Sequence, residues 1–132
     1  MSGEQNLQTL LRGMSANLIE GTYVFVTVPE GAVPADITPR MMFREAEGIT
    51  LILLKSEAEA LGLPYEFPSR MITLNVHSAL DAVGFMAVIA TKLAAAGMGV
   101  NPVAGFYHDH LFIPEDRATD AMAILQQIAA EA

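Results

Sequence analysis

The order of apolar and polar residues is clearest from Met71 to Pro114, where it predicts a strand, a helix and two more strands. Met71–Val76 is an apolar run of strand length. Apolar residues then recur every three or four positions through Val83–Ala96, the spacing of one buried helix face. Two β-prone runs follow, Val100–Phe106 and His110–Ile113. The pattern therefore predicts β-α-β-β in this region.

Local signals set the expected ends of these elements. Ser78 precedes Asp81 by three residues, a capping-box spacing that predicts a helix start there. Gly97 suits the residue after a helix end. Pro102 cannot donate a backbone hydrogen bond, so its strand is expected at a sheet edge or a bulge. Pro114 opens a last helix, whose buried face is expected to comprise Ala118, Ala121, Met122, Leu125, Ile128 and Ala129.

The first half of the chain has a weaker version of the same pattern. A second capping-box match, Ser56 with Glu59, predicts a short helix that ends near Gly62. The other predicted elements are a helix at Glu4–Arg12, a strand at Thr22–Val28, a loop at Pro29–Pro39, and a hairpin of Met41–Ala46 and Ile49–Leu54 around Glu47-Gly48.

Two units with the same order of elements follow from these predictions. Residues 71–131 give β-α-β-β-α, and residues 22–62 give the same order with a loop in place of the first helix. A β-α-β-β-α-β unit is the ferredoxin-like arrangement. We therefore expect an α+β protein of two ferredoxin-like units, the first degenerate, with antiparallel sheets and helices on one face. The expected domains are residues 1–66 and 67–132.

Composition narrows the classes of protein. The 132 residues are 52% apolar, but no apolar run approaches the ~20 residues of a membrane span. No secretory signal pattern is recognisable and there is no cysteine, so we expect a cytoplasmic protein. The net charge of −8 disfavours nucleic acid as a partner, since phosphate binding needs a basic surface.

Catalysis has little support in the sequence. His77 and Ser78 are adjacent, and neighbouring side chains on an extended chain point to opposite sides, so they form a poor base–nucleophile pair. No glycine-rich phosphate loop follows a strand. We therefore expect no enzyme activity and no cofactor.

Several segments resemble known ACT domains: Ser78–Gly84 after a strand, Leu93–Gly97, and Val100-Asn101. Ala104–Pro114 looks similar to a family of small bacterial proteins with two tandem ACT-like units, which resemble the regulatory domain of aspartate kinase without the kinase. This resemblance implies a regulatory protein or sensor that binds a small molecule, most often an amino acid, between two ACT units.

The resemblance and the local chemistry together suggest a binding site. The turn before the helix would present free backbone N–H groups and the positive end of the helix dipole, which suit a carboxylate. The alternative is that Ser78 only caps the helix and Gly84 only relieves packing. Asn101 would bind the ligand from the strand, or would simply close a turn. The expected ligand-binding residues are Ser78, Ala79, Leu80, Val83, Gly84 and Asn101.

Two other functions stay open at this point. One is an interaction module whose pocket is filled by side chains. The other is a protein that binds a divalent metal through His108, Asp109 and His110, although three converging ligands are needed and no metal site is assigned. Whatever the function, Val100–Phe106 is expected to be an apolar edge strand, and it contains no lysine to oppose pairing. We therefore expect a homodimer that covers this strand.

Overall fold

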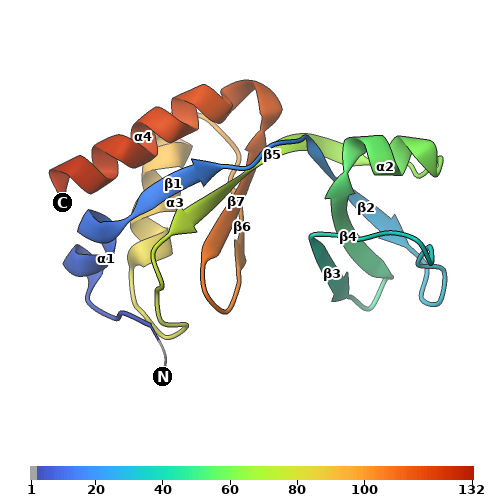
Figure 1. Cartoon of the computed structure of the whole chain (residues 1–132), viewed down its shortest axis with the longest axis horizontal. Helices are drawn as coiled ribbons and strands as arrows, with labels where there is room; N and C mark the ends of the chain where they lie inside the picture. Colours follow the sequence, from blue (N-terminus) through green and yellow to red (C-terminus); the bar gives the residue numbers. More distant parts are fainter. Residues whose placement is uncertain (1–2) are drawn as a thin grey trace. The chain divides into compact units, whose positions relative to one another are not determined.

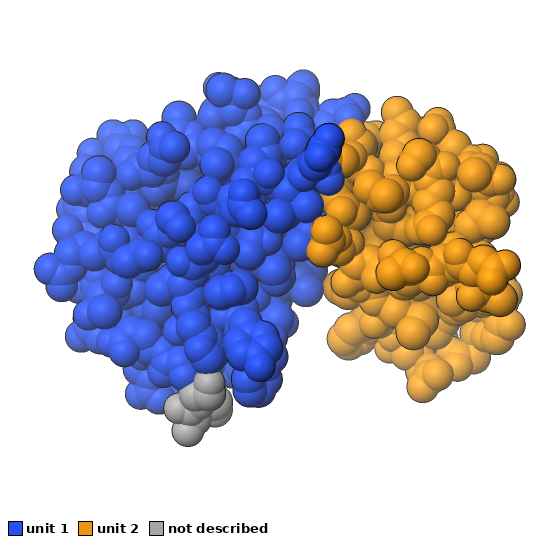
Figure 2. Space-filling view, in the orientation of Figure 1, with its two compact units in different colours: residues 1–20, 70–132 blue, residues 21–69 orange. Residues whose placement is uncertain are grey.

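The computed structural model of this protein describes residues 3–132, which form two compact units (Figure 1). Figure 2 colours them separately: the large unit contains residues 3–20 and 70–132, and the small unit contains residues 21–69. One long strand, β5 (Glu66–Asn75), runs from the small unit into the large one.

The large unit is a complete ferredoxin-like unit with strand order β1-β5-β7-β6. Its fourth strand, β1, comes from the beginning of the chain and pairs antiparallel with β5, Ser15 opposite Asn75 and Leu18 opposite Ile72. Its elements besides β5 are α1 (Leu7–Gly13), β1 (Ser15–Leu18), α3 (Phe85–Ala95), β6 (Asn101–Ala104), β7 (Asp109–Pro114), the 3₁₀ turn η1 (Glu115–Arg117) and α4 (Ala118–Glu131).

Three helices cover one face of this sheet. Alternate residues of β5 and β7 point to that face, as the two-residue period of a strand requires. They are buried in one apolar cluster with residues of α1, α3 and α4. Its fully or almost fully buried members include Leu10, Leu11, Met14, Ile72, Leu74, Phe85, Ile89, Leu93, Leu111, Ile113, Ala121 and Leu125.

The small unit has the same strand order with one helix fewer. Its order is β3-β4-β2-β5, and its elements besides β5 are β2 (Tyr23–Val28), β3 (Met41–Arg44), β4 (Ile49–Leu54) and α2 (Lys55–Ala60). Val33 and Ile37, from the segment between β2 and β3, pack against its apolar core. That segment occupies the place of the missing helix in chain order, which explains the degenerate pattern.

The structure confirms the expected fold class: an α+β protein of two ACT-type units with antiparallel sheets. Pro102 lies on β6, at the edge of the sheet, as its missing N–H predicts. The compact units nevertheless differ from the expected domains, 1–66 and 67–132, because residues 3–20 pack with the second half of the chain. β1 was not anticipated, since its four residues carry no strong β pattern.

Both predicted capping boxes are wrong. Helix α3 begins at Phe85 instead of near Asp81, and its N-cap is Gly84 in a left-handed conformation with φ of 96°. The Ser78 hydroxyl instead donates to Asp109, a residue 31 positions away. Helix α2 begins at Lys55 without a side-chain cap. Serine hydroxyls bond to whichever acceptor the fold brings near, so a local spacing alone did not predict their partners.

Helix length and composition also bear on membrane insertion. Among residues 3–132, no helix combines the length and the apolar character needed to cross a bilayer.

Candidate ligand-binding site

A cavity of about 200 Å³ opens in the large unit where the loop between β5 and α3 meets the β6–β7 hairpin. The loop, the first turn of α3 and the ends of β6 and β7 all contribute to its wall. The lining residues are Ser78, Ala79, Leu80, Ala82, Phe85, Met86, Ala104, Gly105 and Asp109. Most of them are apolar or small, as is usual for a small-molecule site.

The beginning of the chain holds this loop in place. The Glu4 N–H donates to the His77 carbonyl at 2.8 Å, and the Ala79 N–H donates to the Glu4 carbonyl at 2.9 Å. Gly3 allows this close approach: a Cβ there would lie 2.7 Å from the Ala79 nitrogen. The Gln5 amide also donates to Asp81 at 3.2 Å. The loop is therefore anchored by backbone bonds on the side of the N-terminal segment.

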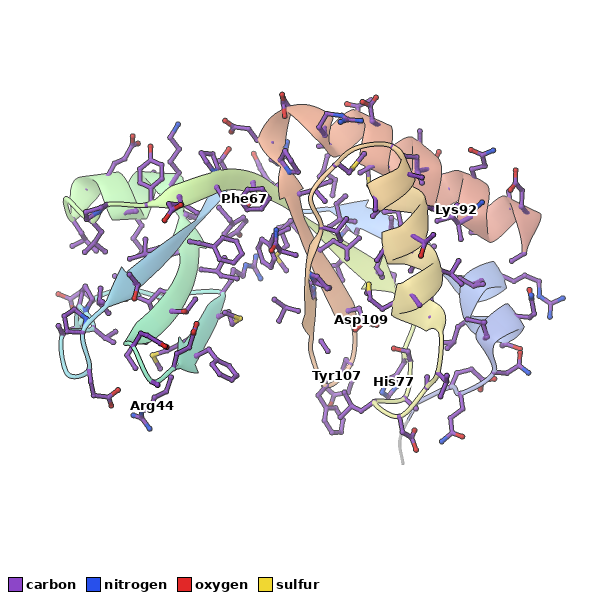
Figure 3. All side chains as sticks on the ribbon, turned by 180° about the vertical axis from the view of Figure 1, so that it is seen from behind. Arg44, Phe67, His77, Lys92, Tyr107 and Asp109 are labelled. Atoms are coloured by element: carbon purple, nitrogen blue, oxygen red, sulfur yellow. The ribbon has the colours of Figure 1, made fainter. Side chains whose placement is uncertain are left out.

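Among the described residues 3–132, Asp109 is the only charged one that lines the cavity. It is the first residue of β7, opposite Ala104, and faces the helix layer with Leu111 because alternate strand residues share a face. Figure 3 shows the labelled Asp109 close to the first turn of α3. Its Oδ2 accepts a hydrogen bond from the Ser78 hydroxyl at 3.2 Å. The electrostatic character of the cavity wall is therefore negative on the β7 side.

The N-terminal end of α3 forms the other polar part of the wall. The first backbone bond of the helix runs from the Val88 N–H to the Gly84 carbonyl at 3.1 Å, so the N–H groups at Phe85 and Met86 precede it. No side chain caps this end of the helix. Phe85 and Met86 both line the cavity. The positive end of the helix dipole thus lies across the cavity from Asp109.

The structure brings together three of the six expected site residues. Ser78, Ala79 and Leu80 line the cavity, whereas Val83 does not and is 84% exposed. Gly84 serves as the N-cap of α3, where an added Cβ would meet a Leu7 methyl group at 3.3 Å. Asn101 lies opposite Phe112 on β6, on the sheet face that points away from the helices, so it does not share the cavity.

Six lining residues were not among the expected site residues: Ala82, Phe85, Met86, Ala104, Gly105 and Asp109. The sequence contained a usable signal for Asp109. It lies two residues before Leu111 and four before Ile113, and this alternation places it on the helix-facing side of β7. Phe85 and Met86 were assigned to the interior of a helix that was expected to begin four residues earlier. Their position at the first turn follows only from the observed helix start.

The segment His108-Asp109-His110 does not act as one group. His108 lies in the turn, and its Nδ1 is 3.3 Å from the Val76 carbonyl. His110 points to the opposite sheet face, with its Nδ1 3.0 Å from the Thr73 hydroxyl. No set of three or more His, Asp or Glu side chains in residues 3–132 is placed to hold a metal ion. The metal hypothesis therefore has no geometric support from this segment.

Exposed apolar side chains lie in the β6–β7 turn, directly after the lining residue Gly105, and at the lining residue Leu80. The rings of Phe106 and Tyr107, in the β6–β7 turn, are 5.0 Å apart, and His77 lies 5.5 Å from Tyr107 (Figure 3). Phe106, Tyr107 and the lining residue Leu80 are each more than half exposed. Exposed aromatic and aliphatic side chains that lie together favour contact with a ligand or with a protein surface.

Comparison with solved structures shows how widespread this architecture is. A protein of unknown function from Vibrio cholerae, described as a possible transport protein, is 42% identical; the match covers 97% of this chain and 99% of that one, with a TM-score of 0.83. A protein from Agrobacterium tumefaciens is 17% identical over 88% of this chain and 89% of its own, with a TM-score of 0.74. The regulatory subunit of aspartate kinase from Thermus thermophilus is 14% identical over 88% and 97%, with a TM-score of 0.62.

Comparison with protein families leads to an assignment. Comparison with curated proteins found no match. Residues 2–70 and residues 66–127 each match an ACT domain. The two matches follow each other along the chain, although residues 3–20 fold into the large unit. With two ACT domains in tandem and a close relative over nearly its whole length, this chain belongs to the ACT-domain family.

Proposed function

We propose that this protein is a regulatory sensor that binds a small molecule, an amino acid, in the cavity of its large unit, and that it has no catalytic activity of its own. The observation that carries the proposal is the place of the cavity: the loop after the first strand of a complete ACT unit, next to an uncapped helix end. Regulatory neighbours such as the aspartate kinase subunit support the class of function.

An amino acid has groups that match the three parts of this cavity. Its carboxylate would lie at the N-terminal end of α3, where backbone N–H groups and the helix dipole favour negative charge. Its ammonium would lie toward Asp109 and Ser78. An apolar side chain would pack against Leu80 and Met86. The alternative, an interaction module without ligand, is favoured by the exposed residues Phe106 and Tyr107 of the β6–β7 turn.

A thermal-shift screen of the full chain with each of the twenty amino acids tests this proposal. Binding at 100 times Kd is expected to stabilise the protein by about 2.7 kcal/mol. Ala82→Phe, which adds a ring to the cavity wall, should abolish the shift. Ala94→Phe, on the exposed side of α3, should leave it unchanged. If no amino acid raises the melting temperature, the sensor proposal fails and the interaction module takes its place.

We also propose a homodimer formed through β6. This strand is at the sheet edge and pairs only with β7 among the described residues, so its outer backbone groups are available to a second copy. Its end contributes Ala104 and Gly105 to the cavity. A copy added there would therefore lie next to the ligand. The cytoplasmic location expected from the sequence stays a prediction.

Light scattering after size-exclusion chromatography tests which edge strand forms the dimer. Val103→Lys on β6 is expected to convert the dimer to monomer, because lysine on an edge strand opposes pairing. Phe43→Lys is the matched variant on β3, the edge strand of the small unit, and is expected to remain dimeric. A wild-type protein that is monomeric at micromolar concentration, or a dimer sensitive only to Phe43→Lys, would rule out pairing through β6.

A further inference from the structure

We propose that Asp109 selects the ligand by charge, so that the cavity accepts a small molecule with a cationic nitrogen group and an apolar remainder, and discriminates against acidic amino acids. This inference rests on the proposed ligand site but concerns the chemical class of the ligand. It follows from the one carboxylate that residues 3–132 contribute to the wall, from its free acceptor capacity, and from the lack of a lysine or arginine among the described lining residues.

The charge of the lining residues is the first argument. Asp109 contributes a negative charge, and none of the other eight lining residues is ionisable. The neighbouring loop residue Asp81 adds a second carboxylate outside the wall. A ligand with a carboxylate side chain would meet like charge here without a lysine or arginine to offset it. A protonated nitrogen would meet opposite charge.

The hydrogen bonding of Asp109 is the second argument. Within residues 3–132 its carboxylate accepts one hydrogen bond, from the Ser78 hydroxyl to Oδ2. A carboxylate has about four acceptor positions on its two oxygens. Oδ1 is therefore available to a ligand donor, and an ammonium group, with its several N–H bonds, supplies donors as well as charge.

The remaining wall is the third argument. Leu80, Ala82, Phe85 and Met86 present carbon surface, and Met86 is a flexible side chain that adapts to differing shapes. Such a surface favours an aliphatic or aromatic ligand body. Asp109 faces the same side of the sheet as this apolar wall, so one small molecule can contact both.

The test is calorimetric titration of the full chain with five probes. L-leucine, L-lysine and isoamylamine each carry a protonated nitrogen on an aliphatic body. 4-Methylpentanoate has the skeleton of leucine without the nitrogen, and L-glutamate adds a second carboxylate. At least one of the first three is expected to bind the protein. 4-Methylpentanoate and L-glutamate are expected to bind at least about tenfold more weakly than that probe, the loss typical of one charge-assisted hydrogen bond.

The variants identify the residue responsible. Asp109→Asn keeps the shape of the side chain and an acceptor for Ser78. It is expected to weaken the binding of the amine about tenfold or more, with little change in the melting temperature of the protein. Asp81→Asn, in the loop between β5 and α3 but outside the wall, is the matched control and is expected to leave affinity within about twofold. Equal binding of wild type and Asp109→Asn, or binding of 4-methylpentanoate as tight as that of the amines, would overturn the inference.

The two proposals fail separately. If an amino acid binds at the cavity without dependence on Asp109, the sensor proposal stands and charge selection is wrong. If isoamylamine binds through Asp109 but none of the twenty amino acids does, charge selection stands and the amino-acid proposal is wrong. If none of the three amine probes binds, the inference on charge is wrong.

Discussion

A chain shortened to residues 67–132 is expected not to fold, although it contains a sequence that looks like a whole ACT domain. The large unit takes β1 and helix α1 from the beginning of the chain. Removing them deletes the core residues Leu10, Leu11 and Met14, all 6% exposed or less, and uncovers the apolar side chains of the same cluster that remain. Burial of such side chains contributes about 1.5–3 kcal/mol each, so their loss approaches the whole stability of a typical domain, about 5–15 kcal/mol.

Circular dichroism and urea titration of the fragment measure this effect. The fragment should show little regular structure and no cooperative transition. A synthetic peptide of residues 3–20, added in excess, should restore a cooperative transition because it supplies the missing strand and helix. The same peptide with Leu10 replaced by aspartate should not, since a charge would then be buried in the core. A fragment that unfolds cooperatively by itself would show that β1 is dispensable.

Leu74→Ala is expected to lower the free energy of unfolding by about 2–5 kcal/mol, the range for a fully buried leucine. Leu74 lies on β5 opposite Ala16 of β1 and is 0% exposed within the core cluster of the large unit. The substitution removes its contacts with the helix layer and leaves a cavity that the sheet cannot readily close. Urea unfolding followed by circular dichroism gives the change in free energy.

Val83→Ala is the matched control for that measurement. Val83 is also aliphatic but is 84% exposed in the loop before α3, so its loss should change stability by no more than about 0.5 kcal/mol. A comparable cost for the two substitutions would mean that the loop is packed in solution. A small cost for Leu74→Ala would mean that the core of the large unit is not close-packed around β5.

Local patterns were enough for most elements of the fold. Strands such as Ile49–Leu54 and helices such as α4 were predicted close to their observed bounds, because the spacing of their apolar residues reports which face is buried. The edge position of β6 followed from Pro102, whose missing N–H is a property of the residue itself. These features depend on interactions within a few residues, so the sequence displays them directly.

The candidate site was predicted only in part. Ser78, Ala79 and Leu80 line the cavity, and they were expected to because they follow a strand in a segment that resembles an ACT domain. Asp109 was considered only as a metal ligand, together with His108 and His110. The structure separates these three side chains between the turn and the two faces of the sheet.

By itself, the sequence of this protein determined its fold class, the order of most of its elements and a loop that lines the candidate site, because backbone propensity and the spacing of apolar residues act locally. Only the tertiary structure decided the partner of Ser78, the start of α3 at Phe85, and the origin of the fourth strand of the large unit. Each of these depends on groups that are far apart in the chain. A hydroxyl or a strand edge accepts any suitable partner, and only the packing of the core determines which one is within reach.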